Sequence, residues 1–549
     1  MTLVWLGAGP APAWPLGRSL NAGPTPSALA ECLARESSGT EAAWVFWSAR
    51  AGVLDPERVL RALAGPEDVW HAGLKLGLAG LPRAIDFVAP TWMLNRDPSP
   101  ELEATSWRLS LEACVVRSEV LRQLGGVRAE FQSLDGAGLE LGHRWISRGA
   151  LMRHCPDLLA GPPAKAHGGL PLEDEMRFVY YRFGRFWLRW SLGRALLHRY
   201  VGPWRARGIR RRLEATPAPA PSAPLHVSTV SVSDSRPAPA SITVLIPTVD
   251  RYPYLEKLLG QLRNQTVPPL EIVVVDQTPA DRRRSDLSER FPDLPLKVFQ
   301  LDQAGQCSSR NLGLEASKGD YFLLLDDDDE VPPDIVERHL RSLRRFRNQV
   351  SCGVALEDGA GALPEAFRVL RVSDVFPAGN SMVSRAALGD SGLFDLAYER
   401  GARADADLGM RLYLSGQLMV LDPEVEVLHR HAPRGGLRTH GARVVTYASS
   451  RKRLLHRQMP GATELYLAKR YFSPRQVREM LWLQASATLA FKGSRGRRAL
   501  KAVLGLLLLP DTFRKLRRRE RDADAMMAAG PRIPMFRSLD TVRRSLVNR

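Results

Sequence analysis

The chain has 549 residues, more than one hydrophobic core usually accommodates, so two or three domains are expected. Its 44% apolar and 25% charged residues are typical of a globular protein and exclude a fibrous or largely disordered chain. The 77 Lys and Arg against 59 Asp and Glu give a net charge of +18, which attracts nucleic acid, phosphorylated ligands or an acidic membrane leaflet.

The five cysteines show neither the paired spacing of a metal site nor the density of a disulfide framework. Residues 1–15 lack the basic flank and sustained apolar run of a signal peptide, and no segment approaches the roughly 20 apolar residues of a membrane span. We therefore expect reduced thiols and a cytoplasmic protein.

Residues 1–213 contain segments that match a later part of the chain. Trp44–Glu57 aligns without a gap to Tyr321–Asp334, and both predict an apolar strand followed by a turn containing Pro. In this alignment, an Ala-Arg-Ala sequence at 49–51 stands where the later segment has consecutive aspartates at 326–328.

Two further matches follow in chain order. Glu112–Gly126 resembles Asn380–Phe394, and a predicted helix at residues 137–145 resembles residues 404–412, with Gly138 in the place of Asp405. Residues 1–213 are therefore predicted to be a partial, degenerate copy that keeps the packing positions but lacks the carboxylates for metal binding or proton transfer. Short strand–turn–helix segments can also match by chance.

Residues 182–212 mix aromatic side chains with many arginines. Such a segment can bind nucleic acid or face a membrane, but no nucleic-acid-binding motif accompanies it, and we expect no nucleic-acid partner. A stretch rich in Pro, Ala and Ser follows at 214–240 and predicts a linker. It separates the first region from a predicted catalytic domain at 241–445 and a basic helical region at 446–549.

The domain after the linker begins with a predicted strand–helix–strand unit. Ile242–Ile246 and Glu271–Asp276 are short runs rich in β-branched residues, and Tyr254–Gln265 has the apolar spacing of a helix. Ligands of open parallel sheets bind beyond the carboxyl ends of the strands, which places residues 248–251 and Asp276 at such a crevice.

A third strand carries the most conspicuous acidic cluster. A helix start at Ser308–Gly313 precedes the apolar strand Tyr321–Leu325, which runs directly into five acids, Asp326–Glu330. Neighbouring carboxylates repel one another unless a cation is present, and hard oxygen ligands favour Mg²⁺ or Mn²⁺. A solvated turn is the alternative explanation of such a run.

These features resemble glycosyltransferase family 2. Members have a GT-A fold with a first strand ending near Pro-Thr, an Asp after the second strand, an Arg-Asn-x-Gly helix and an Asp-x-Asp (DxD) metal motif, and this order recurs here. The resemblance implies an α/β, Rossmann-like, mostly parallel sheet with flanking helices, preceded by the degenerate copy and followed by a helical tail. It also implies a nucleotide site at Pro247, Thr248, Asp276, Arg310, Asn311 and Asp326.

The same resemblance extends to the metal, acceptor and base. It implies Asp328 as the direct metal ligand together with Asp326, and a His such as His429 near the metal or diphosphate. Residues 379–382, including Asn380, Ser381 and Met382, resemble the acceptor-side loop. Asp405 matches the general base, whereas Asp407 reads as a helix acid stabilised by the macrodipole.

Two departures from the family pattern concern the base and the donor. Ala404 replaces the acid that usually precedes the base, and Gln277-Thr278-Pro279 replaces the Asp-Gly-Ser turn after the nucleotide Asp. Chemically, one carboxylate that deprotonates an acceptor hydroxyl and one metal that offsets charge on a departing diphosphate are enough for single displacement with inversion.

The basic tail from about residue 446 alternates Arg and Lys clusters with an apolar block at 499–509. Such a segment can lie on the inner face of an anionic membrane, or it can form a helical cap over the acceptor cleft.

The sequence therefore predicts an inverting, metal-assisted glycosyltransferase of cell-surface polysaccharide synthesis. It would use a nucleotide-diphosphate sugar, with UDP-sugar as the first candidate, and a glycan or lipid-linked acceptor. A non-enzymatic glycosyltransferase-like scaffold is the alternative, followed by a nucleotidyltransferase, which would normally carry a Gly-rich phosphate loop after the first strand.

Overall fold

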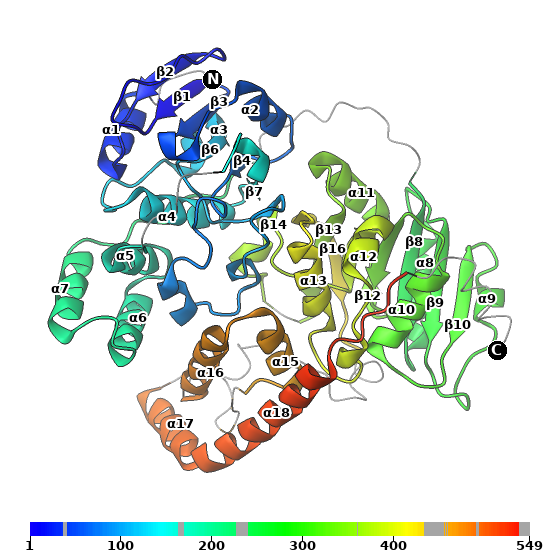
Figure 1. The fold of residues 1–549 in the computed structure, drawn as a ribbon. Coiled ribbons are helices and arrows are strands. Elements are labelled where there is room, and N and C mark those ends of the chain that lie inside the picture. Colours follow the sequence, from blue (N-terminus) through cyan, green and yellow to red (C-terminus); the bar gives the residue numbers. More distant parts are fainter. Residues whose placement is uncertain are drawn as a thin grey trace.

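The computed structural model describes residues 1–36, 41–162, 169–226, 240–359, 361–432, 455, 457, 459–489 and 494–536. About half of the predicted linker, residues 227–239, and the start of the predicted tail lie outside these residues. The described chain forms two sheet-containing units and a group of C-terminal helices that lies below both units in Figure 1. We call residues 1–213 the first unit and residues 241–445, described to 432, the second unit.

The first unit contains a seven-stranded sheet in the order β2-β1-β3-β6-β4-β7-β5. Its strands are β1 (Thr2–Trp5), β2 (Arg18–Asn21), β3 (Ala43–Trp47), β4 (Val69–His71), β5 (Ala104–Thr105), β6 (Ala113–Arg117) and β7 (Met152–His154). Its helices are α1 (Pro26–Glu36), α2 (Pro56–Leu63), α3 (Ser118–Leu124), α4 (Leu134–Ile146), α5 (Leu172–Phe183), α6 (Arg185–Leu197) and α7 (Pro203–Glu214).

The second unit contains a nine-stranded sheet in the order β10-β9-β8-β11-β15-β13-β16-β12, with β14 paired to β16. Its strands are β8 (Ile242–Thr248), β9 (Glu271–Asp276), β10 (Leu296–Gln300), β11 (Tyr321–Leu325), β12 (Asp329–Glu330), β13 (Val350–Glu357), β14 (Arg371–Val372), β15 (Asn380–Ser384) and β16 (Met419–His429). Its helices are α8 (Tyr252–Leu262), α9 (Leu287–Arg290), α10 (Gln306–Ala316), α11 (Ile335–Phe346), α12 (Arg385–Ser391) and α13 (Ala404–Leu414).

Strands β10, β9, β8 and β11 are mutually parallel. They are short and rich in β-branched or aliphatic residues, and every residue of β9 is buried, as expected for a sheet covered on both faces. Helix α8 begins with Pro near its first turn and buries Leu255, Leu258, Leu259 and Leu262 on one face, which fits the helical apolar spacing. The predicted α/β class with parallel-rich sheets, flanking helices and a helical C-terminal region is confirmed.

The two sheets share one topology. In both, two parallel pairs (β1 with β2 and β3; β8 with β9 and β11) are followed by one strand, β6 or β15, that is antiparallel to both of its neighbours. A parallel pair, β4–β7 or β13–β16, comes next, and a short antiparallel strand, β5 or β12, completes the order. Strand β6 pairs with β3 over five residues, Arg117 opposite Ala43, as β15 pairs with β11, Ser384 opposite Tyr321. Arg117 therefore corresponds to Ser384 and not to Arg385.

This register corrects both strand alignments by one residue, because pairing of backbone groups, rather than similarity of side chains, defines equivalent positions. Residues 48–51, Ser-Ala-Arg-Ala, stand in the place of the four aspartates 326–329. The alignment of residues 137–145 with residues 404–412, which sets Gly138 against Asp405, has the same offset as β6 and β15 and needs no correction.

A shared arginine contact supports the helix equivalence. Arg144 of α4 donates to the carbonyls of residues 124–126 at the end of α3 and pairs with Glu140. Arg411 of α13 donates to the carbonyls of residues 391–393 at the end of α12 and pairs with Asp407. In both units, one guanidinium thus satisfies the carbonyls left unpaired where a short helix ends.

The C-terminal helices are α15 (Ala462–Tyr471), α16 (Pro474–Leu489), α17 (Arg495–Leu507) and α18 (Leu509–Ala529). Arg194 of α6 forms a buried ion pair with Glu479 of α16, which fixes these helices to the first unit. After α18 the chain runs back, red in Figure 1, toward the second unit, where Phe536 stacks on Phe322 of β11. Among the described residues, no helix combines the length and apolar character needed to cross a membrane.

Candidate active site

The carboxyl ends of β8, β9 and β11 meet at one edge of the second sheet, because these strands are adjacent and parallel. Pro247 and Thr248 end β8, Asp276 ends β9, and Asp326 follows β11 directly. The structure therefore brings these four predicted nucleotide-site residues to the same edge, as the strand rule for open α/β sheets requires.

Two of the four consecutive aspartates are held by residues of the β8–α8 connection. Thr248 donates to Asp327 at 2.7 Å, and Arg251 pairs with Asp327 at 2.8 Å and with Asp328 at 3.1 Å. Burial raises the pKa of Asp327 to about 6, although Arg251 favours its charged form. The sequence had placed Arg251 at the crevice but gave no sign that it would offset the charge of these acids.

Asp326, Asp329 and His429 form a cluster whose ligand atoms all lie within 4.8 Å of one another. The pairing of β12 with β16 sets Asp329 opposite His429, and the His429 Nδ1 lies 2.9 Å from the Asp329 carboxylate. Two carboxylates and an imidazole are a suitable ligand set for Mn²⁺ and, less favourably, for Mg²⁺. The predicted ligands Asp326 and His429 thus lie together, joined by Asp329, which the sequence analysis did not select.

Asp328 lies beside this cluster but points elsewhere. Its carboxylate accepts a hydrogen bond from the Ala432 N–H at 2.8 Å, and its nearest contact with His429 is 3.8 Å. It is buried and ties the chain after β16 to the acidic turn. In this structure the ligand geometry therefore favours Asp329 over Asp328.

In the cluster, Asp329 and His429 shift each other's pKa, and the neighbouring backbone at Gly379 lies close to Asp326. Burial raises the pKa of Asp329 to about 7, with His429 opposing the shift. Burial alone would lower the pKa of His429, but its hydrogen bond to Asp329 and the neighbouring acids raise it to about 9. Gly379 lies beside them, and a Cβ there would come within 2.8 Å of Asp326 Oδ2, so a larger residue would displace this carboxylate.

Asp276, the predicted nucleotide-base ligand, is almost fully buried. It accepts hydrogen bonds from the Tyr252 hydroxyl at 2.6 Å and from the Thr278 N–H at 2.9 Å. These contacts fix the turn 277–279, whose sequence departs from the family pattern. Tyr252 was not singled out from the sequence, because an aromatic residue at a helix start usually belongs to the core.

Arg310 and Asn311, predicted near the nucleotide, have different surroundings. Arg310 pairs with Asp326 at 2.9 Å and so reaches the acidic cluster. Asn311 donates to the Phe394 carbonyl and accepts from the Phe394 N–H, and so fixes the loop after α12. Both side chains are buried at the base of the site.

The acceptor-side loop expected at residues 379–382 needs correction. Asn380, Ser381 and Met382 lie within strand β15, and all three are buried. The Asn380 amide donates to the carbonyls of Val354 and Val425, while Met382 packs in the core. A run of small and apolar residues suits a central strand as well as a loop, so sequence resemblance alone could not separate the two.

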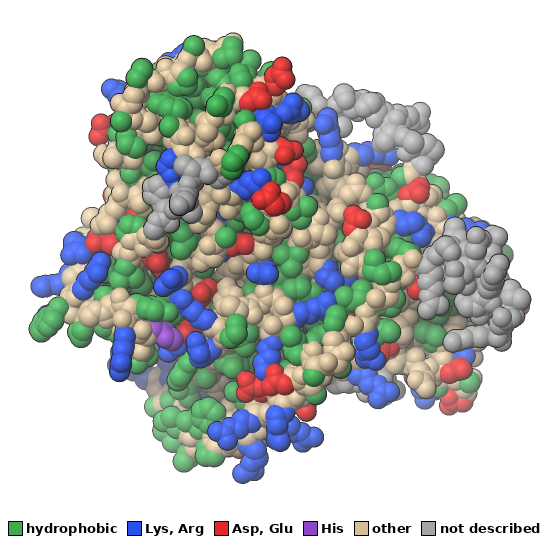
Figure 2. Space-filling model, viewed as in Figure 1, with side chains coloured by type: hydrophobic (Ala, Val, Ile, Leu, Met, Phe, Trp, Pro, Cys, Tyr) green, Lys and Arg blue, Asp and Glu red, His purple; other side chains and the backbone are tan. Residues whose placement is uncertain are grey.

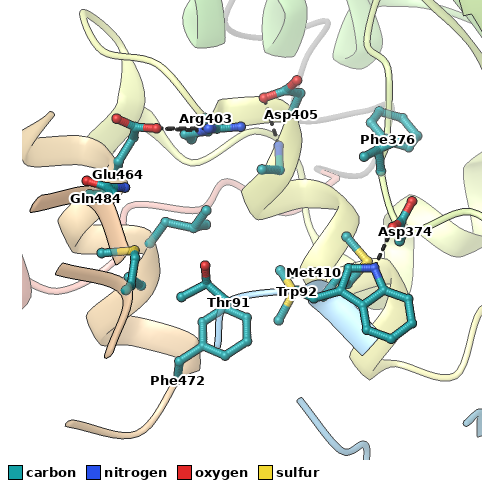
Figure 3. A pocket seen from close by; sticks show the side chains of 16 residues that line it. Thr91, Trp92, Asp374, Phe376, Arg403, Asp405, Met410, Glu464, Phe472 and Gln484 are labelled. Atoms are coloured by element: carbon teal, nitrogen blue, oxygen red, sulfur yellow. Dashed lines mark hydrogen bonds and ion pairs between the residues drawn. The ribbon is translucent and has the colours of Figure 1, made fainter. Parts of the chain in front are cut away.

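Asp405 lies in the first turn of α13 and opens into a cavity of about 310 Å³ (Figure 3). It accepts from the Ala406 N–H at 2.8 Å. The surrounding protein raises the pKa of its carboxyl by desolvation, while Arg403 and Arg310 counteract this shift. Asp405 is thus an accessible carboxylate with increased basicity, as a general base requires.

Asp407, two residues later, is fully buried and structural. It pairs with Arg411 and Arg470, each at 2.9 Å, and accepts from the Tyr471 hydroxyl at 2.8 Å. Because Arg470 and Tyr471 belong to α15, Asp407 connects the second unit to the C-terminal helices.

The corresponding edge of the first unit has a different composition. Arg50, in the place of Asp328, forms two bonds to Glu112, at 2.7 and 2.8 Å. Glu112 occupies the position of Gly379, so the first unit has a carboxylate where the second unit has no side chain. An ion pair thus replaces the acidic cluster.

A match to a protein-family model shows which known proteins the second unit resembles. Residues 243–367 match the model described as glycosyl transferase family 2. The chain contains a glycosyltransferase family 2 domain. This match runs from β8 to beyond the end of β13 and therefore includes the acids 326–330, but not Asp405 or His429.

Similar proteins share this family 2 region. The putative glycosyltransferase EpsH of Bacillus subtilis is 31% identical over 119 residues, covering 21% of this chain and 34% of EpsH. The GalNAc(5)-diNAcBac-PP-undecaprenol beta-1,3-glucosyltransferase of Campylobacter jejuni is 32% identical over 93 residues, covering 16% of this chain and 30% of that protein. The chain thus spans about a third of the length of these relatives.

Among solved structures, the mannosyltransferase PcManGT of Pyrobaculum calidifontis, in complex with GDP-Man and Mn²⁺, is 20% identical with a TM-score of 0.34. The similarity covers 52% of this chain and 86% of that one.

Proposed function

We propose that the chain is an inverting glycosyltransferase that moves a sugar from a nucleotide-diphosphate donor to a hydroxyl of a glycan or lipid-linked acceptor. The observation that carries this proposal is the acidic cluster at the carboxyl edge of a family 2 domain, together with an accessible Asp405. The C. jejuni relative is named as a glucosyltransferase for a PP-undecaprenol-linked glycan, which supports a lipid-linked acceptor and, in this proposal, a role in cell-surface polysaccharide synthesis.

In this proposal Asp326, Asp329 and His429 hold Mg²⁺ or Mn²⁺, and Asp328 supports them through its bond to Ala432. When bound, the metal would offset the negative charge that develops on the departing diphosphate. Arg310, paired with Asp326, adds a second positive charge near this position.

Asp405 acts as the general base. Its carboxylate takes the proton of the acceptor hydroxyl as the hydroxyl oxygen attacks the anomeric carbon and the bond to the diphosphate breaks. The raised pKa of Asp405 makes it a better proton acceptor. A single attack from the face opposite the leaving group inverts the anomeric configuration.

The donor nucleotide is proposed to bind beside Pro247, Thr248 and Asp276, with a UDP-sugar as the first candidate. Asp276 is oriented by Tyr252 and Thr278, so it offers a fixed carboxylate at the end of β9.

Helix α17 provides a surface for peripheral membrane contact. Its exposed side carries Leu500, Val503, Leu506 and Leu507, which are 46–72% exposed. In Figure 2, hydrophobic side chains gather at the lower end of the molecule, where Figure 1 places α17, with Lys and Arg side chains beside them. An apolar helix face flanked by basic residues suits the anionic inner leaflet, where a lipid-linked acceptor would be found.

A non-enzymatic scaffold is the second candidate, and the first unit shows what supports it: the same topology persists there with an ion pair in place of the acids. The second unit keeps its carboxylates, which favours the enzyme.

The proposal is tested by titrating the protein with UDP, GDP and dTDP and their sugars, with Mn²⁺, Mg²⁺ or chelator, by isothermal calorimetry. Asp326→Asn keeps the shape of the side chain but removes a ligand charge, and metal-dependent binding should be lost. Asp293→Asn is the matched control, since Asp293 is an exposed acid paired with Arg263. Absence of binding by the wild-type protein across the panel would favour the scaffold.

A further inference from the structure

The cavity at Asp405 is built from three parts of the chain. Thr91, Trp92 and Met93 come from the first unit, residues of β14–α13 come from the second unit, and α15–α16 supply the remaining wall. In Figure 3, Trp92, joined to Asp374, and Phe472 both lie below Asp405 and come from these different parts. The first unit therefore contributes directly to the surroundings of the proposed general base.

The contribution of the first unit is fixed by specific contacts. The Trp92 indole N–H donates to Asp374, whose other oxygen pairs with Arg371 at 2.9 Å. Met93 packs on α13 at Gly409, where an added Cβ would lie 3.2 Å from the Met93 methyl group. These contacts hold the Trp92 loop against the second unit, so this wall is formed before any ligand binds.

The lining of the cavity selects for an uncharged group. Most lining side chains are apolar, namely Trp92, Met93, Val375, Phe376, Met410, Leu467, Phe472 and Met480. Of its carboxylates, Asp374 pairs with Arg371 and Glu464 with Arg403, so Asp405 is the lining carboxylate that disfavours an anion. Arg403 pairs with Glu464 at 2.8 Å and so offers little net positive charge. A diphosphate is therefore better accommodated at the acidic edge with its metal than in this cavity.

We propose that the first unit completes the acceptor site, and that Trp92 binds the apolar face of a neutral, hydroxyl-bearing acceptor whose hydroxyl reaches Asp405. The inference rests on the proposed function. The apolar face is either the C–H face of a neutral sugar ring or the first part of an alkyl chain, since both pack on an indole ring. The degenerate copy thus acts as a substrate-binding domain.

The test uses octyl β-glucoside, methyl β-glucoside and octyl β-glucuronide as probes of the full chain. Their binding is measured by calorimetry and saturation-transfer NMR, with donor and Mn²⁺ titrated separately. We expect octyl glucoside to bind, the glucuronide to bind more weakly, and Trp92→Ala to weaken octyl glucoside binding about tenfold. Trp204→Ala is the matched control, because Trp204 is 83% exposed on α7.

Binding of methyl glucoside as tight as octyl glucoside would identify a sugar face, and dependence on the octyl chain would identify a lipid. Equal binding by wild type and Trp92→Ala, or preference for the glucuronide, would overturn the inference. So would a parallel loss of metal-dependent donor binding in Trp92→Ala, which would show a structural role.

If Trp92→Ala does not fold, Phe472→Ala tests the opposite wall, and Trp92→Phe keeps an aromatic face without the N–H. The inference then requires weaker probe binding by Phe472→Ala and nearly unchanged binding by Trp92→Phe. If the wild-type protein binds the probes but no donor, the proposed function fails while the cavity assignment stands.

Discussion

Asp405 and Asp407 lie two residues apart on α13, and their surroundings give them different tasks. Asp405 faces a cavity with a single backbone hydrogen bond, whereas Asp407 is enclosed by Arg411, Arg470 and Tyr471. A proton acceptor must be accessible and incompletely neutralised, and only Asp405 meets both conditions.

Asp405→Asn should therefore lower the rate of sugar transfer about 100- to 10,000-fold while leaving donor and metal affinity nearly unchanged. The amide fills the same space but cannot take the proton. Steady-state kinetics and donor calorimetry on the same preparation separate the two effects. Equal losses of donor affinity and rate would instead indicate that Asp405 positions the donor.

Asp407→Ala should destabilise the protein, because it removes the partner of two buried guanidinium groups. Breaking a buried ion pair costs about 3–5 kcal/mol, and here the contact between α13 and α15 would also weaken. Urea denaturation followed by tryptophan fluorescence measures the loss. A stability equal to that of the wild-type protein would show that Arg470 finds another partner.

At the scale of elements, Glu175 of α5 should make the stability of the protein depend on pH. Glu175 accepts from the Ala84 N–H, and burial raises the pKa of its carboxyl to about 7 from 4.5. Between these pH values the folded state keeps a proton that the unfolded chain releases. Stability should therefore fall as pH rises through this window.

Glu175→Gln removes this titration and can still accept from Ala84. The free energy of unfolding of the variant should exceed that of the wild-type protein by up to about 3 kcal/mol at pH 8, and the two should differ little at pH 4.5. Urea midpoints at the two pH values measure the change. A difference that does not vary with pH would contradict the assignment to Glu175.

Elements with a strong local pattern could be predicted from the sequence. The strands Glu271–Asp276 and Tyr321–Leu325 agree with prediction to the residue, because their apolar runs are bounded by polar turns. The choice between Asp328 and Asp329 could not be predicted, since it depends on β12 pairing with β16, about 100 residues away in sequence. The role proposed for Trp92 could not be predicted either, because Trp92 and Asp405 line one cavity only after the two units pack together.

Across the whole molecule, the C-terminal helices link the proposed acceptor site to the proposed membrane surface. Helix α16 lines the cavity through Met480 and Gln484 and packs against α17, whose exposed side is apolar. If α17 binds a membrane as proposed, α16 would connect the membrane surface to the proposed acceptor site.

Replacing Leu506 and Leu507 together by Glu should abolish binding to phosphatidylglycerol vesicles in a sedimentation assay, because it puts two charges on the face that would enter the bilayer. Wild-type binding should also weaken with added salt, which screens the attraction between the basic residues of α17 and α18 and the lipid head groups. Leu270→Glu is the matched control, since Leu270 is 50% exposed on the second unit. Vesicle binding by the double variant equal to that of the control would show that α17 is a solvated helix, and the acceptor would then have to reach Asp405 from solution.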